Sequence, residues 1–146
     1  MQIEALARDV LTELRDRAPS EAHVPVTADG GEPLRCCLRN AEPREQLLLT
    51  SYSPPLPDSP YREHGPIFLH ADATDCTPLP AGFPPMSSAR RQALRAYDER
   101  GWIRETELAE PGESAALTTK LLAEPGVSFV EVRSPGHGCY MFRVRR

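Results

Sequence analysis

Proline is concentrated in one part of this 146-residue chain, and this restricts its fold more than any other feature. Nine of the 16 prolines lie between residues 54 and 85. Because proline lacks an amide donor and fixes its own backbone, such a segment cannot form a continuous helix or a central strand. We therefore expect two long proline-rich loops, from Ser53 to Gly65 and from Ala71 to Pro85, with a short strand over residues 66–70 between them.

Apolar periodicity predicts the regular elements around these loops. Residues 2–17 have the spacing of an amphipathic helix, and residues 113–124 fit a second helix that ends before Pro125-Gly126. Residues 92–97 and 102–108 are typical of a hairpin whose turn needs the left-handed conformation at Gly101. Further strands are expected over residues 34–39, 46–52, 127–132 and 139–144.

The order of these elements favours an α+β fold. Helices near both ends enclose a run of strands, and short connections such as Asn40 to Glu45 suit antiparallel neighbours, because a parallel crossover needs a dozen residues or more. We expect a single domain over residues 1–146. Its central, mostly antiparallel sheet should have about six or seven strands, with both helices packed on one face and the proline-rich loops at an edge or over the second face.

Charge and motif content exclude several classes of function. The net charge is −4, and the only basic cluster is the last four residues, so a nucleic-acid partner is disfavoured. There is no apolar run long enough for a membrane span and no secretory signal, which favours a cytoplasmic protein. Phosphate-loop, dinucleotide, nucleophile-elbow and zinc-protease motifs are all missing, so we expect no cofactor. Nothing in the sequence fixes the oligomeric state.

The four cysteines are expected to be free thiols. Neighbouring side chains in a strand point to opposite faces, so Cys36 and Cys37 should not bind one ion together. A mononuclear site from His70, His137 and Cys139 would require the last strand to lie beside the third. No short ligand spacing supports it, and we expect no metal.

Several motifs resemble an uncharacterised bacterial family, domain of unknown function 1203. The most specific is Ser59-Pro60-Tyr61-Arg62-Glu63-His64-Gly65-Pro66-Ile67-Phe68, and the likeness covers roughly residues 30 to 146. The other matching segments are Pro33-Leu34-Arg35, Asn40-Ala41-Glu42, Leu47-Leu48-Leu49, Leu94-Arg95-Ala96-Tyr97-Asp98 and Gly138-Cys139-Tyr140 with Arg143. The chain departs from the family pattern at Leu34, where a cysteine is common, and at Val132-Arg133-Ser134, which replaces a His-Asn-type stretch. The resemblance implies no established activity.

The loop of this motif is the first candidate binding site. Arg62 can hold a carboxylate or phosphate through two parallel hydrogen bonds, Tyr61 adds a hydroxyl donor, and His64 lies in the same loop. His70, at the end of the following strand, would complete a pocket for an anion. The alternative is structural: Arg62 pairs with a neighbouring acid and Tyr61 packs on the sheet.

Cys139 is the candidate nucleophile. A nearby imidazole, from His137 or His70, would lower the thiol pKa and act as a base. Tyr140 and Arg143, from the same closing segment, are expected to contribute to ligand binding. The alternative is that Cys139 is an inert residue at the start of a strand.

The sequence therefore leaves three functions open. The preferred one is a binding domain for a small anionic ligand, with or without modest chemistry, in a pocket formed by the Tyr61/Arg62 loop, His70 and Gly138-Cys139. The others are a non-catalytic protein interaction module that uses the proline-rich surface, and a cysteine-dependent enzyme that uses Cys139.

Overall fold

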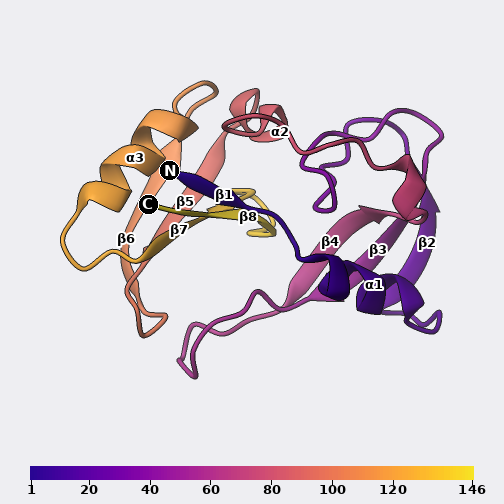
Figure 1. Ribbon diagram of the computed structural model, residues 1–146, viewed down its shortest axis with the longest axis horizontal. Helices are drawn as coiled ribbons and strands as arrows, with labels where there is room; N and C mark the ends of the chain where they lie inside the picture. Colours follow the sequence, from indigo (N-terminus) through magenta and orange to yellow (C-terminus); the bar gives the residue numbers. More distant parts are fainter.

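The computed structural model describes residues 1–146 and contains two antiparallel sheets at opposite ends of an elongated molecule (Figure 1). Buried and partly exposed residues alternate along residues 92–96, whereas residues 129–133 are all buried. The five-stranded sheet has the order β1 (Gln2–Glu4), β8 (Tyr140–Arg145), β7 (Phe129–Arg133), β5 (Gln92–Tyr97) and β6 (Ile103–Ala109). The three-stranded sheet has the order β2 (His23–Thr27), β3 (Gln46–Tyr52) and β4 (Gly65–His70).

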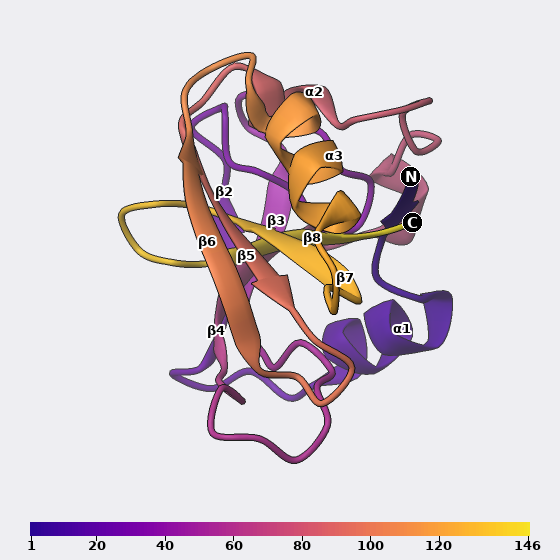
Figure 2. The same ribbon diagram turned by 90° about the vertical axis from the view of Figure 1, so that its left-hand side faces the viewer.

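Each sheet is covered by its own longer helix. Helix α3 (Ser114–Ala123) lies along β5, β6 and β7 of the larger sheet, as Figure 2 shows. Helix α1 (Arg8–Asp16) places Leu14, which is fully buried, in the core of the smaller sheet. The remaining helical segments are the short helix α2 (Pro85–Ser88) and the 3-10 turn η1 (Ala73–Asp75).

Two apolar cores correspond to the two sheets. The larger core includes Leu94, Val130 and Phe142 from the five-stranded sheet together with Leu121 of α3. The smaller core includes Leu47, Ile67 and Leu69 of β3 and β4, Leu14 of α1, and the two thiols Cys36 and Cys37. Tyr140 of β8 also belongs to the smaller core, so the last strand contacts both parts of the molecule.

The predicted α+β class and antiparallel pairing are confirmed, whereas the single central sheet is not. The eight strands divide into two sheets, and the two longer helices cover different sheets rather than one face. The second proline-rich segment lies between β4 of the smaller sheet and β5 of the larger one, whereas the first connects β3 and β4, which pair within one sheet. No helix has the length and apolar character that a membrane span requires.

The predicted helix over residues 2–17 begins too early. Residues Gln2–Glu4 form β1, which pairs with β8 in the register Gln2↔Arg145, and the helix starts only at Arg8. The edge of β8 offers hydrogen bonds that outweigh the helical periodicity of the first few residues. The hairpin prediction is confirmed by β5 and β6, with Gly101 at φ 76° in the turn.

The predicted strand over residues 34–39 is instead a compact turn. Leu38 amide donates to the Leu34 carbonyl (3.0 Å), and Leu38 adopts a left-handed φ of 56°. The Arg35 amide donates to the Phe68 carbonyl (3.0 Å), which fixes the turn on β4. Side chains in a turn do not alternate between faces, so the sequence argument that separated Cys36 from Cys37 does not apply.

Candidate functional site

A groove where the two sheets meet is the best candidate for a binding site. It contains a cavity of about 380 Å³, which lies in the size range of small-molecule pockets. The turn before Cys36, strands β3 and β4, and the β7–β8 connection all contribute to its walls. The lining residues are Pro33, Arg35, Leu49, Pro66, Phe68, Arg90, Ser134, His137 and Cys139.

Arg35 is the central charged group of this cavity. Its side chain donates from Nε to the Tyr140 carbonyl (2.6 Å) and from Nη1 to the Pro33 carbonyl, so the guanidinium is held rigidly between the two sheets. The residue is only 2% exposed, yet no carboxylate forms an ion pair with it. Burial lowers the pKa of Arg35 to about 10 because it disfavours the charged form.

Arg90 supplies a second cation to the same cavity. Its Nη2 donates to the Gly31 carbonyl and to Asn40 Oδ1 (3.3 Å), and it too has no carboxylate partner. The positive charge of Arg90 further lowers the pKa of Arg35, whereas a negative charge on Cys139 would raise it. Two arginines that repel each other are thus held on one cavity without a compensating acid.

His137 and Cys139 lie at the junction of this cavity with a smaller one. The second cavity, of about 140 Å³, shares Pro66, His137 and Cys139 with the first. The β7–β8 connection is fixed by hydrogen bonds from the Cys139 amide to Ser134 Oγ (3.1 Å) and from the Ser134 amide to the Cys139 carbonyl (3.0 Å). The structure therefore brings the candidate thiol and its neighbouring imidazole to one hollow.

Most of the loop that contains Tyr61 and Arg62, the first candidate binding site from the sequence, lies outside this groove. Arg62 is exposed, and Tyr61 is 36% exposed and packs edge-on against Trp102 with ring centroids 5.6 Å apart. Neither residue lines the cavities at Cys139. His64 does line the smaller cavity, beside Tyr52 and Tyr140. Tyr61 thus has the packing role that the sequence left as its alternative, although against the hairpin that joins β5 to β6.

His70 is also separated from Cys139. It is fully buried at the far end of β4, where Nδ1 lies 3.6 Å from Cys36 Sγ, 3.7 Å from Cys37 Sγ and 3.3 Å from Cys76 Sγ. Its other ring nitrogen, Nε2, lies 3.0 Å from Glu45 Oε1. Both ring nitrogens are therefore engaged, and His70 lines neither of the cavities at Cys139.

The thiols around His70 influence one another. Cys36 donates to Cys37 over 4.0 Å, and this contact lowers the pKa of the Cys37 thiol to about 5 while it raises that of Cys36. Burial raises the pKa of Cys76. Arg39 bonds to Glu45 at 2.8 Å, and this bond holds the pKa of Glu45 at about 2, well below its usual range.

Tyr140 and Arg143 have different environments. Tyr140 lines the smaller cavity, and burial raises its pKa. Arg143 is instead bound to fully buried Glu131 (2.8 Å) and to the Pro55 carbonyl (2.7 Å), so it is engaged within the structure. Glu131 also pairs with Arg133 (2.6 Å), which forms a buried ion cluster inside the five-stranded sheet.

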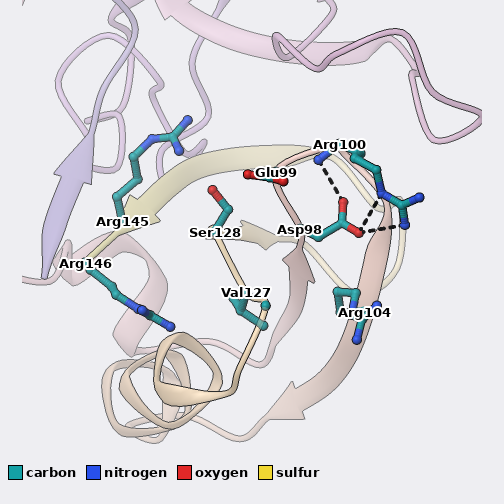
Figure 3. A pocket seen from close by; sticks show the side chains of 9 residues that line it. Asp98, Glu99, Arg100, Arg104, Val127, Ser128, Arg145 and Arg146 are labelled. Carbon is teal, nitrogen blue, oxygen red and sulfur yellow. Dashed lines mark hydrogen bonds and ion pairs between the residues drawn. The ribbon is translucent and has the colours of Figure 1, made fainter.

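The largest hollow, of about 740 Å³, is an open basin at the opposite end of the larger sheet. Arg145 and Arg146 lie on one side of it and Arg100 and Arg104 on the other (Figure 3). Two of these guanidinium groups already have carboxylate partners inside the protein, and a third is held by backbone carbonyls. Arg100 binds Asp98, Arg145 binds Glu4, and Arg146 binds the carbonyls at the end of α3. The basin is therefore less suited to capture an anion than the groove.

The sequence interpretation missed the two groups that dominate these sites. Arg35 lies in the family-like segment Pro33-Leu34-Arg35, which was not interpreted as a binding site, and Arg90 lies in no such segment. Only the fold brings the two together. The cluster of Cys36, Cys37, His70 and Cys76 could hold a metal, since one ligand atom from each lies within 4.8 Å of all the others. The adjacent pair Cys36-Cys37 was the available signal, and the expectation of a strand concealed it.

The molecule is thus an α+β chain with a cationic groove between two antiparallel sheets and a thiol-imidazole cluster beside it. The family described as Protein of unknown function (DUF1203) matches residues 31–146, and the chain belongs to this family. Comparison with curated proteins and with solved structures finds no match.

Proposed function

We propose that this protein binds a small organic anion, a carboxylate or a phosphate ester, in the groove between its two sheets. One observation carries the proposal: Arg35 is a buried cation that lines a cavity and has no carboxylate partner. A buried charge is costly unless it is paired. An anion in the cavity would supply the missing partner, and Arg90 would provide further donors to the same group.

The remaining walls restrict the rest of the ligand. Leu49, Phe68, Pro33 and Pro66 form apolar surface beside the two arginines. A ligand with one anionic group and a small apolar body fits this division better than an inorganic ion, because burial of apolar surface adds to the charge interaction. His137 and Cys139 would contact the end of the ligand that reaches the smaller cavity.

Thermal unfolding against a panel of anions tests the proposal. A ligand that binds only the native state raises the apparent stability, so a matching carboxylate or phosphate ester should raise the Tm in a concentration-dependent way. Arg90→Ala should abolish this shift. Arg62→Ala is the matched control, because it removes an exposed arginine outside the groove and should leave the shift unchanged.

Two results would contradict the anion site. One is the absence of any Tm shift across short-chain and aromatic carboxylates, sugar phosphates and nucleotides. The other is a shift that Arg62→Ala removes and Arg90→Ala retains. Arg35→Lys provides a second variant, since it keeps the charge but loses the planar fork that bonds to the Tyr140 carbonyl.

A cysteine-dependent reaction is the second candidate, favoured by the shared position of Cys139 and His137 on both cavities. Alkylation of Cys139 by iodoacetamide across pH tests it, with peptide mass spectrometry to assign the modified thiol. A reactive thiolate should be alkylated well below pH 8.5 and protected by the bound anion. Alkylation of Cys139 with the pH profile of a free thiol would contradict the proposal that Cys139 is a catalytic nucleophile.

A further inference from the structure

Four side chains from three separate segments converge behind the groove. Cys36 and Cys37 come from the turn after Arg35, His70 ends β4, and Cys76 follows η1. The position of Cys76 is fixed locally, because Asp72 caps the 3-10 turn by accepting from the Thr74 amide (2.9 Å) and the Cys76 amide donates to the Ala73 carbonyl (3.2 Å). Four potential ligands thus meet at one point in a largely buried setting.

The spacing of the four ligand atoms matches a tetrahedral metal site. Bond lengths of about 2.3 Å to sulfur and about 2.0 Å to nitrogen place the ligand atoms of a tetrahedron roughly 3.5 to 3.8 Å apart. Here the distances from His70 Nδ1 to the three sulfurs are 3.3, 3.6 and 3.7 Å, and Cys36 and Cys37 Sγ are 4.0 Å apart. All four ligand atoms lie within 4.8 Å of one another, so a contraction of at most about 1 Å brings them to one central ion.

The ring of His70 presents Nδ1 to the three sulfurs and Nε2 to Glu45 and Arg39. Nε2 lies 3.0 Å from Glu45 Oε1 and 3.1 Å from Arg39 Nη2, and Arg39 in turn binds Glu45 at 2.8 Å. In the tautomer that carries its proton on Nε2, the ring donates to Glu45 and leaves Nδ1 free to bind a metal. A carboxylate that orients the distal nitrogen of a histidine is a recurrent feature of metal ligation.

The surroundings also accommodate the charge of thiolate ligands. The His70 amide donates to Cys36 Sγ (3.3 Å), and Arg15 Nη2 donates to Cys76 Sγ (3.6 Å). Three thiolates with one divalent ion carry a single negative charge, and Glu45 carries another. Arg15 and Arg39 offset both, so the loaded site is electrically neutral.

We propose that Cys36, Cys37, His70 and Cys76 bind one Zn²⁺ ion in a closed, structural site. Three sulfurs and one imidazole in tetrahedral arrangement select zinc among the common divalent ions. All four positions are taken by protein ligands, so the ion has no open coordination site for substrate. It holds the turn after Arg35, the end of β4 and the segment after η1 together, and this does not depend on the anion proposed for the groove.

Metal analysis of the full-length protein tests the site directly. The protein, expressed with zinc and desalted, should contain one zinc per chain, whereas Cys36→Ser and His70→Asn should lose most of it. Cys139→Ser is the matched control, because it removes the one cysteine outside the cluster and should retain the metal. Glu45→Gln should keep the ligands and weaken zinc affinity 10-fold to 100-fold.

Cobalt substitution keeps the test valid if a cysteine variant fails to fold. Co²⁺ added to the metal-free wild-type protein should give the intense visible bands of a tetrahedral site together with thiolate charge-transfer absorption, and zinc should displace it stoichiometrically. Metal-free protein with four freely titratable thiols and no such spectrum would overturn the proposal. So would a disulfide among Cys36, Cys37 and Cys76 in non-reducing peptide maps of freshly purified protein.

Discussion

The two sheets bury polar groups in different ways. In the larger sheet, Glu131 is 0% exposed and is neutralised within the chain by Arg133 and Arg143. In the smaller half, three thiols surround one imidazole, and the groove beside them holds two arginines without an acid. The larger half pairs its buried charges within the chain. The smaller half has buried thiols and arginines for which we have proposed a metal ion and an anion as partners.

The apolar cores show the same contrast. The larger core consists of thirteen buried residues, among them four leucines, four valines, two methionines and one phenylalanine, and they come from β5, β6, β7, β8, α2, α3 and two connecting segments. The smaller core has eleven, and four of these are small residues: Ala28, Ala41, Cys36 and Cys37. Small cores stabilise weakly and often depend on a metal or disulfide. The smaller half should therefore be the one whose stability depends on solution conditions.

Removal of zinc should produce the largest difference in stability between the two halves. Structural zinc supplies binding energy comparable to the whole stability of a small unit. Treatment with a strong chelator should raise amide hydrogen exchange in β2, β3, β4 and the segment after η1 by orders of magnitude. Exchange in β5, β7 and β8 should change little.

The control for this measurement is the Cys139→Ser protein, which should respond to chelator as the wild type does. Uniform loosening of both sheets would contradict the division into a metal-dependent and a self-sufficient half. Unchanged hydrogen exchange in both sheets would show that zinc does not stabilise the smaller half.

Glu131→Gln should be the most damaging change inside the larger half. It leaves Arg133 and Arg143 buried with less compensating charge, and loss of one partner from a buried ion pair costs about 3–5 kcal/mol. Urea unfolding monitored by circular dichroism measures this loss. Glu110→Gln, from the exposed pair with Arg91, should cost at most about 1 kcal/mol. Equal losses for the two variants would show that Glu131 is not essential to the core.

Gly101→Ala tests the contact between the β5–β6 hairpin and the proline-rich loop. Gly101 has φ 76°, and an added Cβ would lie 3.0 Å from Pro57 Cδ. The strained conformation alone costs about 1–3 kcal/mol. Gly112→Ala is the matched control, because φ is 89° but no atom lies within 4 Å of the new Cβ. Thermal melts should show a larger decrease in Tm for Gly101→Ala than for Gly112→Ala. Equal decreases would mean that the proline-rich loop moves away from the new Cβ at no cost in stability.

Asp98→Asn should give the smallest effect and a distinct pH dependence. The Trp102 amide (3.0 Å) and the Arg100 contacts stabilise the carboxylate and lower its pKa from 3.8. Because the folded pKa is below the unfolded one, the stabilisation is present above pH 3.8 and is lost as the pH falls through the folded pKa. The Tm difference between variant and wild type should therefore be largest near neutrality and should narrow in acid. A constant difference would exclude ionisation as its cause.

Strands with clear local patterns were predictable from the sequence. Residues 46–52 form β3 as expected, and the hairpin around Gly101 follows from its turn chemistry. The errors have one physical cause, which is that long-range pairing outweighs local periodicity. The apolar spacing of residues 2–4 is that of a helix, but these residues pair with β8. The sequence of residues 34–39 is typical of a strand, but this segment forms a turn that bonds to β4.

The site was predictable only in part. His137 and Cys139 were identified because their chemistry and proximity are visible in the chain, and they line the same cavity. Arg35 and Arg90 are 55 residues apart and are brought together by the groove, so the family-like segment Pro33-Leu34-Arg35 did not by itself indicate a binding site. Arg62 stood in the most specific motif, yet the loop presents it to solvent.

The first sixteen residues connect the two halves in a way that matters for association between molecules. Strand β1 covers the outer edge of β8 on the larger sheet, and after three residues α1 packs into the smaller core (Figure 1). This segment lies outside the matched residues 31–146. If it detached, the backbone donors and acceptors along β8 would be uncovered, and such a free edge invites strand addition by another chain. The segment therefore protects the edge of β8 from strand addition and also connects the two sheets.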